Sequence, residues 1–211
     1  MNIILKAKQV AEYFFYAVLR YVLRDCDSVL DVGCGTNSAL QFVPGPKIKA
    51  GIDAYKKSID ISKTKHIHDR YTLGDIRRLT SYYAPKSFDA VICIDVIEHI
   101  TSADGKRLIK MMEKIAKKRV IILTPNGFYH QHELEGNPYQ VHKSGWKSAD
   151  FRALGYKVFG LRGLQQLRDD HASVKYRPWF IWGTLTFLSE IIFFPFPDMS
   201  FDILAVKSTG S

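Results

Sequence analysis

The residues best suited to do chemistry begin at a glycine-rich turn between two acids. The run VLDVGCG covers Val29 to Gly35 and ends in a Gly-x-Gly turn. This pattern is typical of a buried strand that enters a loop where a ligand approaches the backbone, because a β-carbon there would block both the turn and the ligand. Asp53 lies 20 positions after Gly33, at the end of the next apolar run, IKAGID. A carboxylate at that spacing holds ribose hydroxyls in nucleotide-binding α/β units, so the residues predict a ligand that contains a nucleoside.

Two kinds of nucleoside cofactor compete for this turn. A dinucleotide site requires Gly-x-Gly-x-x-Gly or Ala, and the third position here is Ser38. Asp31, just before the turn, also places a negative charge where a diphosphate would be repelled. A cofactor with a cationic ammonium group matches that acid better. The residues therefore favour an amino-acid nucleoside, with a tight turn that binds nothing as the alternative.

The run LDVGCG resembles motif I of class I S-adenosylmethionine-dependent methyltransferases. Two later acids fit the same family: Asp75 in the run LGDI, and Asp95 in the run IDVIEHI. The match extends from about Ser28 to Lys157, and within the class it looks like the broad bacterial and archaeal type 11 group. The resemblance implies an enzyme that transfers the methyl group of S-adenosylmethionine to an acceptor.

The resemblance also implies a set of cofactor contacts. The glycine loop would cradle the methionine part, and Asp53 would accept both ribose hydroxyls because a carboxylate suits a vicinal diol. Tyr55 would lie against the adenine, and Asp75 would take its amino group with the Ile76 amide nearby. The implied contact residues are Asp31, Gly33, Cys34, Gly35, Asp53, Ala54, Tyr55, Asp75, Ile76, Asp95 and Val96.

Methyl transfer asks little of the protein, because the sulfonium methyl is already electrophilic and in-line positioning does most of the work. A base matters only for a protonated nucleophile such as a hydroxyl. His99 and His142 are the candidate catalytic bases, with helix capping and loop scaffolding as their structural alternatives. No metal is expected, since no Cys/His set has zinc spacing. The neighbouring His66 and His68 are predicted to lie in a solvated loop.

Strand and helix patterns alternate along the chain. The first strand is predicted in the apolar run that begins at Val29 and ends before the glycine turn. Further strands are predicted over 48–53, 71–73, 87–95, 119–124, 156–163 and 200–207, with helices over 55–65, from a cap at Thr101 to 118, and from a cap at Ser148 to Gly155. Short links between alternating elements indicate a doubly wound α/β fold. With the family resemblance, we expect a Rossmann-like, seven-stranded, three-layer αβα sheet that is mostly parallel, with its last strand antiparallel.

The length of 211 residues predicts one domain, 1–211, with a helix at about 3–24 and an aromatic insertion at about 165–198 as cap elements. The N-terminal segment does not resemble a signal peptide, and the three cysteines are read as reduced thiols in a cytoplasmic protein. The formal net charge of +9 favours anionic partners, either nucleic acid or anionic lipid.

The insertion contains the run WFIWGTLTFLSEIIFFPF. Gly183, Thr186 and Glu190 form a narrow polar stripe at helical spacing, which argues against a transmembrane helix and leaves a buried cap helix or an interfacial helix. The basic residues that precede it, Arg168, Lys175 and Arg177, suit an anionic membrane surface. We therefore expect a small, apolar acceptor and peripheral association with a membrane.

Two other functions stay open at this stage. The charge permits an RNA or other nucleic-acid methyltransferase. However, amino-methylating DNA enzymes carry an Asn/Asp-Pro-Pro-aromatic run after the fourth strand, and this chain has DVIEH at that position. Asn137-Pro138-Tyr139 resembles the run only superficially, because it lies elsewhere in the chain and lacks the second proline. The chain also contains no Pro-Cys dipeptide of the kind that cytosine C5 enzymes use. A non-catalytic cofactor-binding protein on the same fold is the third reading.

Overall fold

A computed structural model describes residues 12–131, 137–169 and 173–210. Its central feature is a sheet of seven strands in the order β3-β2-β1-β4-β5-β7-β6. β7 is antiparallel to both β5 and β6, and the other neighbouring pairs are parallel. The expected fold class is confirmed. The strands are β1 (Ser28–Val32), β2 (Ile48–Asp53), β3 (Arg70–Leu73), β4 (Phe88–Ile94), β5 (Ala116–Pro125), β6 (Lys157–Leu164) and β7 (Ser200–Ser208).

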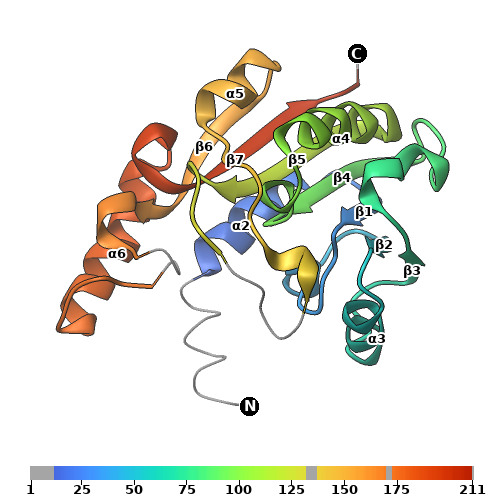
Figure 1. Ribbon diagram of the computed structural model, residues 1–211. Helices are drawn as coiled ribbons and strands as arrows, with labels where there is room; N and C mark the ends of the chain where they lie inside the picture. Colours follow the sequence, from blue (N-terminus) through green and yellow to red (C-terminus); the bar gives the residue numbers. More distant parts are fainter. Residues whose placement is uncertain (1–11, 132–136, 170–172, 211) are drawn as a thin grey trace.

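Helices cover both faces of this sheet (Figure 1). α4 and α5 pack with Trp146 on one face, and α2 packs on the other. The α-helices are α2 (Tyr13–Val22), α3 (Lys56–Thr64), α4 (Ser102–Ile115), α5 (Ser148–Ala153) and α6 (Trp179–Phe193). Short 3₁₀ turns link them: η1 (Ala39–Phe42), η2 (Ile76–Ser81), η3 (Ile97–His99), η4 (Pro138–Gln140), η5 (Gln165–Leu167) and η6 (Pro197–Met199).

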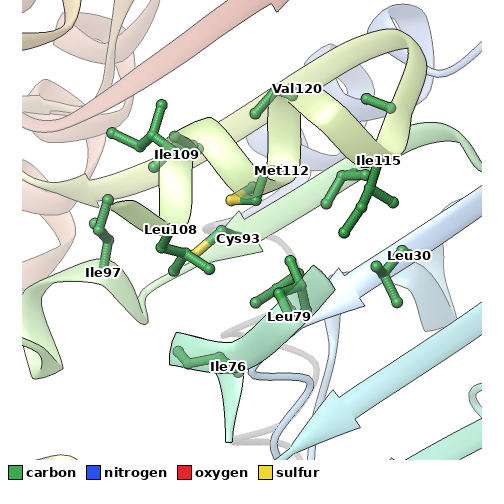
Figure 2. Close-up of a cluster of buried hydrophobic side chains, with 14 of the residues drawn as sticks. Leu30, Ile76, Leu79, Cys93, Ile97, Leu108, Ile109, Met112, Ile115 and Val120 are labelled. Atoms are coloured by element: carbon green, nitrogen blue, oxygen red, sulfur yellow. The ribbon is translucent and has the colours of Figure 1, made fainter. Parts of the chain in front are cut away.

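The larger core lies between α4, η2 and the sheet. Figure 2 shows Leu108 and Met112 of α4 next to Cys93 of β4, with Leu79 of η2 and Leu30 of β1 nearby. These side chains are all buried. Because β4 is covered on both faces, its sequence is a continuous apolar run apart from Asp89, which is why it is the clearest strand signal in the chain.

The parallel register sets where the functional loops emerge. Leu30 of β1 is paired with Ala50 of β2 on one side and with Val91 of β4 on the other. The carboxyl ends of these three strands therefore lie next to one another, and the loops that follow them open at the same edge of the sheet.

Most element predictions are confirmed, and two are corrected. α4 ends at Ile115 rather than at residue 118, because β5 already begins at Ala116, which pairs with Phe88 of β4. Lys147, not Ser148, is the N-cap of α5: its backbone N–H donates to Asp150, while the Ser148 hydroxyl donates to Asp198. The predicted N-terminal helix is present over 13–22, packed on the sheet; residues 1–11 lie outside the described part of the chain.

α6 packs on β6 with its polar stripe facing inward. Thr186, Ser189 and Glu190 are buried, and the Ser189 hydroxyl and the Glu190 carboxylate accept hydrogen bonds from the backbone N–H groups of Leu164 and Arg162. The broad outer face is apolar: Ile181, Leu185, Phe187, Leu188, Ile191 and Ile192 are all exposed. Of the helices in the described ranges, none combines the length and apolarity that crossing a bilayer requires.

Arg162 of β6 joins several elements through ion pairs. Its guanidinium lies 2.6 Å from the Asp202 carboxylate of β7, which is fully buried, and 3.3 Å from Asp95 after β4. Glu12, just before α2, lies 3.8 Å away. The positive charge thus offsets acids from three segments, and removing it would leave the Asp202 carboxylate buried without a counter-ion.

We expect Arg162→Leu to lower the free energy of unfolding by about 3–5 kcal/mol, because it removes the ion-pair partner of the buried Asp202 carboxylate. The matched variant Arg152→Leu removes a half-exposed ion pair to Asp198 and should cost at most about 1 kcal/mol. Urea unfolding of both variants measures the difference. An equal decrease in the free energy of unfolding for the two variants would show that the Arg162 ion pairs stabilise the fold no more than an exposed ion pair does.

Candidate active site

A cavity of about 360 Å³ lies at the carboxyl edge of the sheet, where β1, β2 and β4 end. Its size falls in the range of small-molecule sites. All but one of the residues predicted to contact the cofactor line it: Asp31, Gly33, Cys34, Gly35, Asp53, Ala54, Asp75, Ile76, Asp95 and Val96. Tyr55 is the exception. Its ring lies outside this lining, with its centroid 6.5 Å from that of Tyr139, which does line the cavity.

The glycine loop follows β1 and is fixed by the neighbouring strand. The backbone N–H groups of Gly33 and Cys34 both donate to the carbonyl oxygen of Ile52, at 2.8 and 3.1 Å. Gly33 has φ +74° and Gly35 φ +56°, conformations that side chains disfavour. A β-carbon on Gly33 would also lie 2.5 Å from the Val96 side chain. Glycine at 33 therefore lets the loop pack closely against the segment after β4.

Asp53, at the end of β2, is oriented by the glycine loop itself. Its Oδ2 accepts from the Gly35 N–H at 2.9 Å, and its Oδ1 accepts from the Tyr55 N–H at 2.8 Å. Partial burial raises the pKa of Asp53, and these two hydrogen bonds act in the opposite direction. Each carboxylate oxygen keeps a second lone pair, so a bound diol can still donate to it. The position and geometry suit the predicted ribose contact.

Asp75 follows β3 and is held by a single neighbour. The Arg77 guanidinium donates to both carboxylate oxygens, at 2.7 to 3.0 Å, and its backbone N–H adds a further bond to Oδ1. These bonds lower the pKa of Asp75. The carboxylate is therefore fixed in its charged form beside Ile76, where it can accept from an amino group.

Asp31 has a partner that sequence reasoning missed. His68 is buried, not solvated, and its Nε2 lies 3.0 Å from Asp31 Oδ2. The prediction of a solvated loop is wrong for His68 and right for His66, which is exposed. The sequence gives no clear signal for this, because the two histidines lie two positions apart in the short link before β3. Asp31 thus lines the cavity with part of its hydrogen-bonding capacity already used.

The wall of the cavity opposite the strand ends is formed by η4 and the residues around it, none of which was predicted to contact the cofactor. Asn137, Tyr139, Gln140 and Lys143 all line the cavity. This segment is fastened to η3, because the Lys143 N–H donates to the Glu98 carbonyl oxygen at 2.7 Å. No motif signals this contact, since it joins residues far apart in the chain.

The two predicted catalytic histidines lie together. The ring centroids of His99 and His142 are 4.8 Å apart, and His99 lines the cavity while His142 lies behind it. Burial lowers the pKa of His99 to about 4, and His142 adds to the effect, so the His99 imidazole is neutral near pH 7. A group with that pKa is a weak general base. Whether either histidine moves a proton remains a prediction.

The three cysteines do not supply a nucleophile. All are free and buried. Burial raises the pKa of Cys34, which lines the cavity, and that of Cys93 on β4 behind it. A buried, protonated thiol is unreactive, so Cys34 contributes its small size and its backbone to the loop.

Comparison with known proteins agrees with the family resemblance of the sequence. A sequence model described as a methyltransferase domain matches residues 30–124, which run from β1 through β5. The matched region contains the glycine loop and each strand-end acid described above. This region is a methyltransferase domain, as the class I resemblance predicts. S-adenosylmethionine is the methyl donor of this class, and the expected family and cofactor are thereby confirmed.

Solved structures agree on the fold. A SAM-dependent methyltransferase from Archaeoglobus fulgidus superposes with a TM-score of 0.60 at 17% identity, covering 98% of this chain and 100% of that one. Magnesium protoporphyrin IX methyltransferase from Synechocystis PCC 6803, with bound SAH, gives 0.57 at 14% identity over 100% and 89%. The methyltransferase domain of bacterial CtHen1 gives 0.58 at 19% identity over 93% and 97%. No curated protein matches the chain.

The cavity of this methyltransferase domain fits S-adenosylmethionine by its chemistry. Carboxylates at two neighbouring strand ends suit the ribose hydroxyls and the adenine amino group. The acid at Asp31 suits an ammonium group. Asp95 Oδ1 is buried and has no hydrogen-bond partner in the described ranges of the chain, so the wall also offers an unused acceptor. A diphosphate would be repelled by the acids at the strand ends, which favours the sulfonium cofactor.

We expect Asp53→Ala to weaken S-adenosylmethionine binding about 10- to 100-fold, as for the loss of hydrogen bonds to a charged group. The domain should stay folded, because the carboxylate serves a loop and a ligand rather than the core. Asp60→Ala, an exposed acid on α3 paired with Lys56, is the matched control and should bind normally. Calorimetry that finds unchanged affinity in a folded Asp53→Ala protein would refute the ribose assignment.

Proposed function

We propose that this methyltransferase transfers the methyl group of S-adenosylmethionine to a small, lipophilic or membrane-associated acceptor by in-line displacement. The observation that carries the acceptor class is the outward apolar face of α6. A helix that buries its polar residues and exposes its apolar ones is opposite to the usual surface helix, and an exposed apolar patch of that kind marks an interaction surface.

The surroundings of α6 favour an anionic lipid surface as the partner. Phe196 and Met199, just beyond the helix, extend the exposed apolar area, and Lys175 and Arg177 before it are exposed cations. Cations beside an apolar helix suit anionic headgroups. Arg168 does not take part as expected: it is half-buried, and its guanidinium donates to the Arg162 carbonyl oxygen.

A direct chain of contacts links α6 to the cavity. Glu190 of α6 accepts from the backbone N–H of Arg162, and the Arg162 side chain reaches Asp95 in the cavity wall. The apolar face and the cofactor cavity therefore belong to one connected structure. This supports delivery of an acceptor from the membrane surface to the cavity.

The protein's part in the reaction is positional. S-adenosylmethionine supplies an electrophilic methyl group on its sulfonium. The glycine loop and Asp31 would hold the methionine part, Asp53 the ribose, and Asp75 with Ile76 the adenine. The wall formed by Tyr139 and Lys143 narrows the cavity on the other side, which limits water and fixes the direction of approach.

The acceptor class is tested by incubating the protein with isotope-labelled S-adenosylmethionine and separate lipid and polar extracts. We expect label in the lipid fraction, because an acceptor that meets α6 must partition into membranes. Label confined to RNA would support the nucleic-acid alternative. Cofactor binding with no labelled pool would support a non-catalytic role, and either result would refute the proposal.

Membrane association is tested by a point change on the outer face of α6. Ile192 is 62% exposed. Ile192→Glu should lower flotation with anionic phosphatidylglycerol vesicles about tenfold or more, because the variant loses the free energy gained when one isoleucine side chain is buried in the membrane. Ile48→Glu makes the same chemical change at the first residue of β2, where 39% of the residue is exposed, and should float like the wild type. Equal flotation of the two variants would remove the membrane argument.

A further inference from the structure

Three metal-ligand side chains converge behind the cofactor cavity. Glu98 and His99 lie on η3 after β4, and His142 comes from the segment after η4. One ligand atom of each residue lies within 4.8 Å of the others. Two ligands of one ion lie up to about 4.4 Å apart, because each binds at about 2.0–2.2 Å. Side-chain shifts of a few tenths of an ångström would therefore bring all three onto one ion.

Both imidazoles are arranged as metal ligands usually are. His142 Nδ1 lies 2.8 Å from the carbonyl oxygen of Tyr129. A carbonyl only accepts, so Nδ1 carries the proton and Nε2 keeps a free lone pair; this backbone anchor is the usual second contact of a metal-bound histidine. His99 Nδ1 is buried and has no hydrogen-bond partner among the described residues. A buried nitrogen without a partner needs an explanation, and a bound ligand supplies one.

Glu98 brings a buried carboxylate to the same place. The residue is 2% exposed, and the Thr124 hydroxyl donates to its Oε2 at 2.9 Å, which fixes the orientation of the group. Within the part of the chain that the structure describes, no lysine or arginine forms an ion pair with Glu98. An isolated buried carboxylate is costly, and a divalent cation would neutralise it.

The segment that carries His142 is attached directly to this turn. The backbone N–H groups of Lys143 and Ser144 both donate to the Glu98 carbonyl oxygen, at 2.7 and 3.0 Å. The three side chains are thus held near one another by the backbone, before any ion binds.

We propose that Glu98, His99 and His142 bind a divalent transition-metal ion next to the cofactor cavity. Two imidazole nitrogens and one carboxylate oxygen suit Mn²⁺, Fe²⁺, Co²⁺ or Zn²⁺ better than Ca²⁺, and three protein ligands leave coordination positions open. The proposal departs from the expectation of no metal. The expectation of no metal was based on ligands close in sequence, whereas His142 lies 43 positions after His99.

The location gives the ion a role in transfer, and this role rests on the proposed function. His99 lines the cofactor cavity, so an ion bound to it would lie beside the space where an acceptor would bind. A hydroxyl bound to the cation has a lowered pKa and loses its proton to water. Its oxygen lone pair then forms the bond to the methyl carbon while the carbon–sulfur bond breaks. The electron pair of that bond stays on sulfur, which becomes a neutral thioether. The acceptor is thereby narrowed to a compound with a hydroxyl group.

The site is tested by titrating tag-free, metal-stripped full-length protein with Mn²⁺, followed by electron paramagnetic resonance, and with Zn²⁺ or Co²⁺ by calorimetry. We expect saturable binding of one ion per chain and at least a tenfold loss of affinity in His142→Ala. His66→Ala removes an exposed histidine and is the matched control, with unchanged metal binding. Unchanged S-adenosylmethionine affinity in His142→Ala, which lies outside the cavity lining, verifies that the variant is folded.

Two results would overturn the site: no saturable binding of any of the three ions, or His142→Ala binding them as the wild type does. The catalytic role has its own test, because methyl transfer that persists unchanged in EDTA would refute it. These outcomes are separate from the acceptor class. Failure to label a lipid fraction would refute the lipophilic acceptor. It would not affect the conclusion about the metal site, because the metal titration needs no acceptor.

Discussion

The structure depends above all on the parallel pairing of β1 with β2 and β4. Hydrogen bonds along these strands fix their register, so three segments of the chain that end far apart in sequence end side by side in space. The glycine loop, Asp53 and Asp95 follow those ends. A slip of register in any pair would move one of them away from the shared cavity and turn its strand's buried side chains to the wrong face. The site is therefore a consequence of the sheet rather than of any one loop.

Arg162 extends this organisation to the later part of the chain. It lies at an irregularity of β6, with φ +58°, where the strand's pairing with β7 shifts register between Leu161 and Leu164. From there its guanidinium reaches the acids Asp202 and Asp95, while its backbone N–H donates to Glu190 of α6. The aromatic insertion is thus connected to the cofactor edge by charge and hydrogen bonds as well as by chain connectivity. The apolar helix is held in place by its polar stripe, which leaves its apolar face available to a partner.

Much of the fold could be read from the sequence, because its signals are local. β4 is a continuous apolar run, Thr101 caps α4 as its spacing with Asp104 predicts, and Gly155 with φ +82° ends α5. The errors lie at boundaries that tertiary pairing decides. β5 begins at Ala116 because this residue pairs with Phe88 of β4, and Ser148 is not the N-cap because its hydroxyl donates to Asp198.

The sequence by itself determined the class of fold and, through the family resemblance of its motifs, the methyl donor. Gly33, Asp53 and Asp75 stand at strand ends, and strand ends are visible as changes in hydrophobic pattern. Only the tertiary structure decided the pairing of Asp31 with His68, the convergence of Glu98, His99 and His142, and the outward direction of the apolar face of α6. Each of these joins residues from different elements. Periodicity within one element shows that a helix has a polar and an apolar face. Which face turns toward the sheet depends on the hydrogen-bonding groups and side chains of the neighbouring strands, and these come together only when the chain has folded.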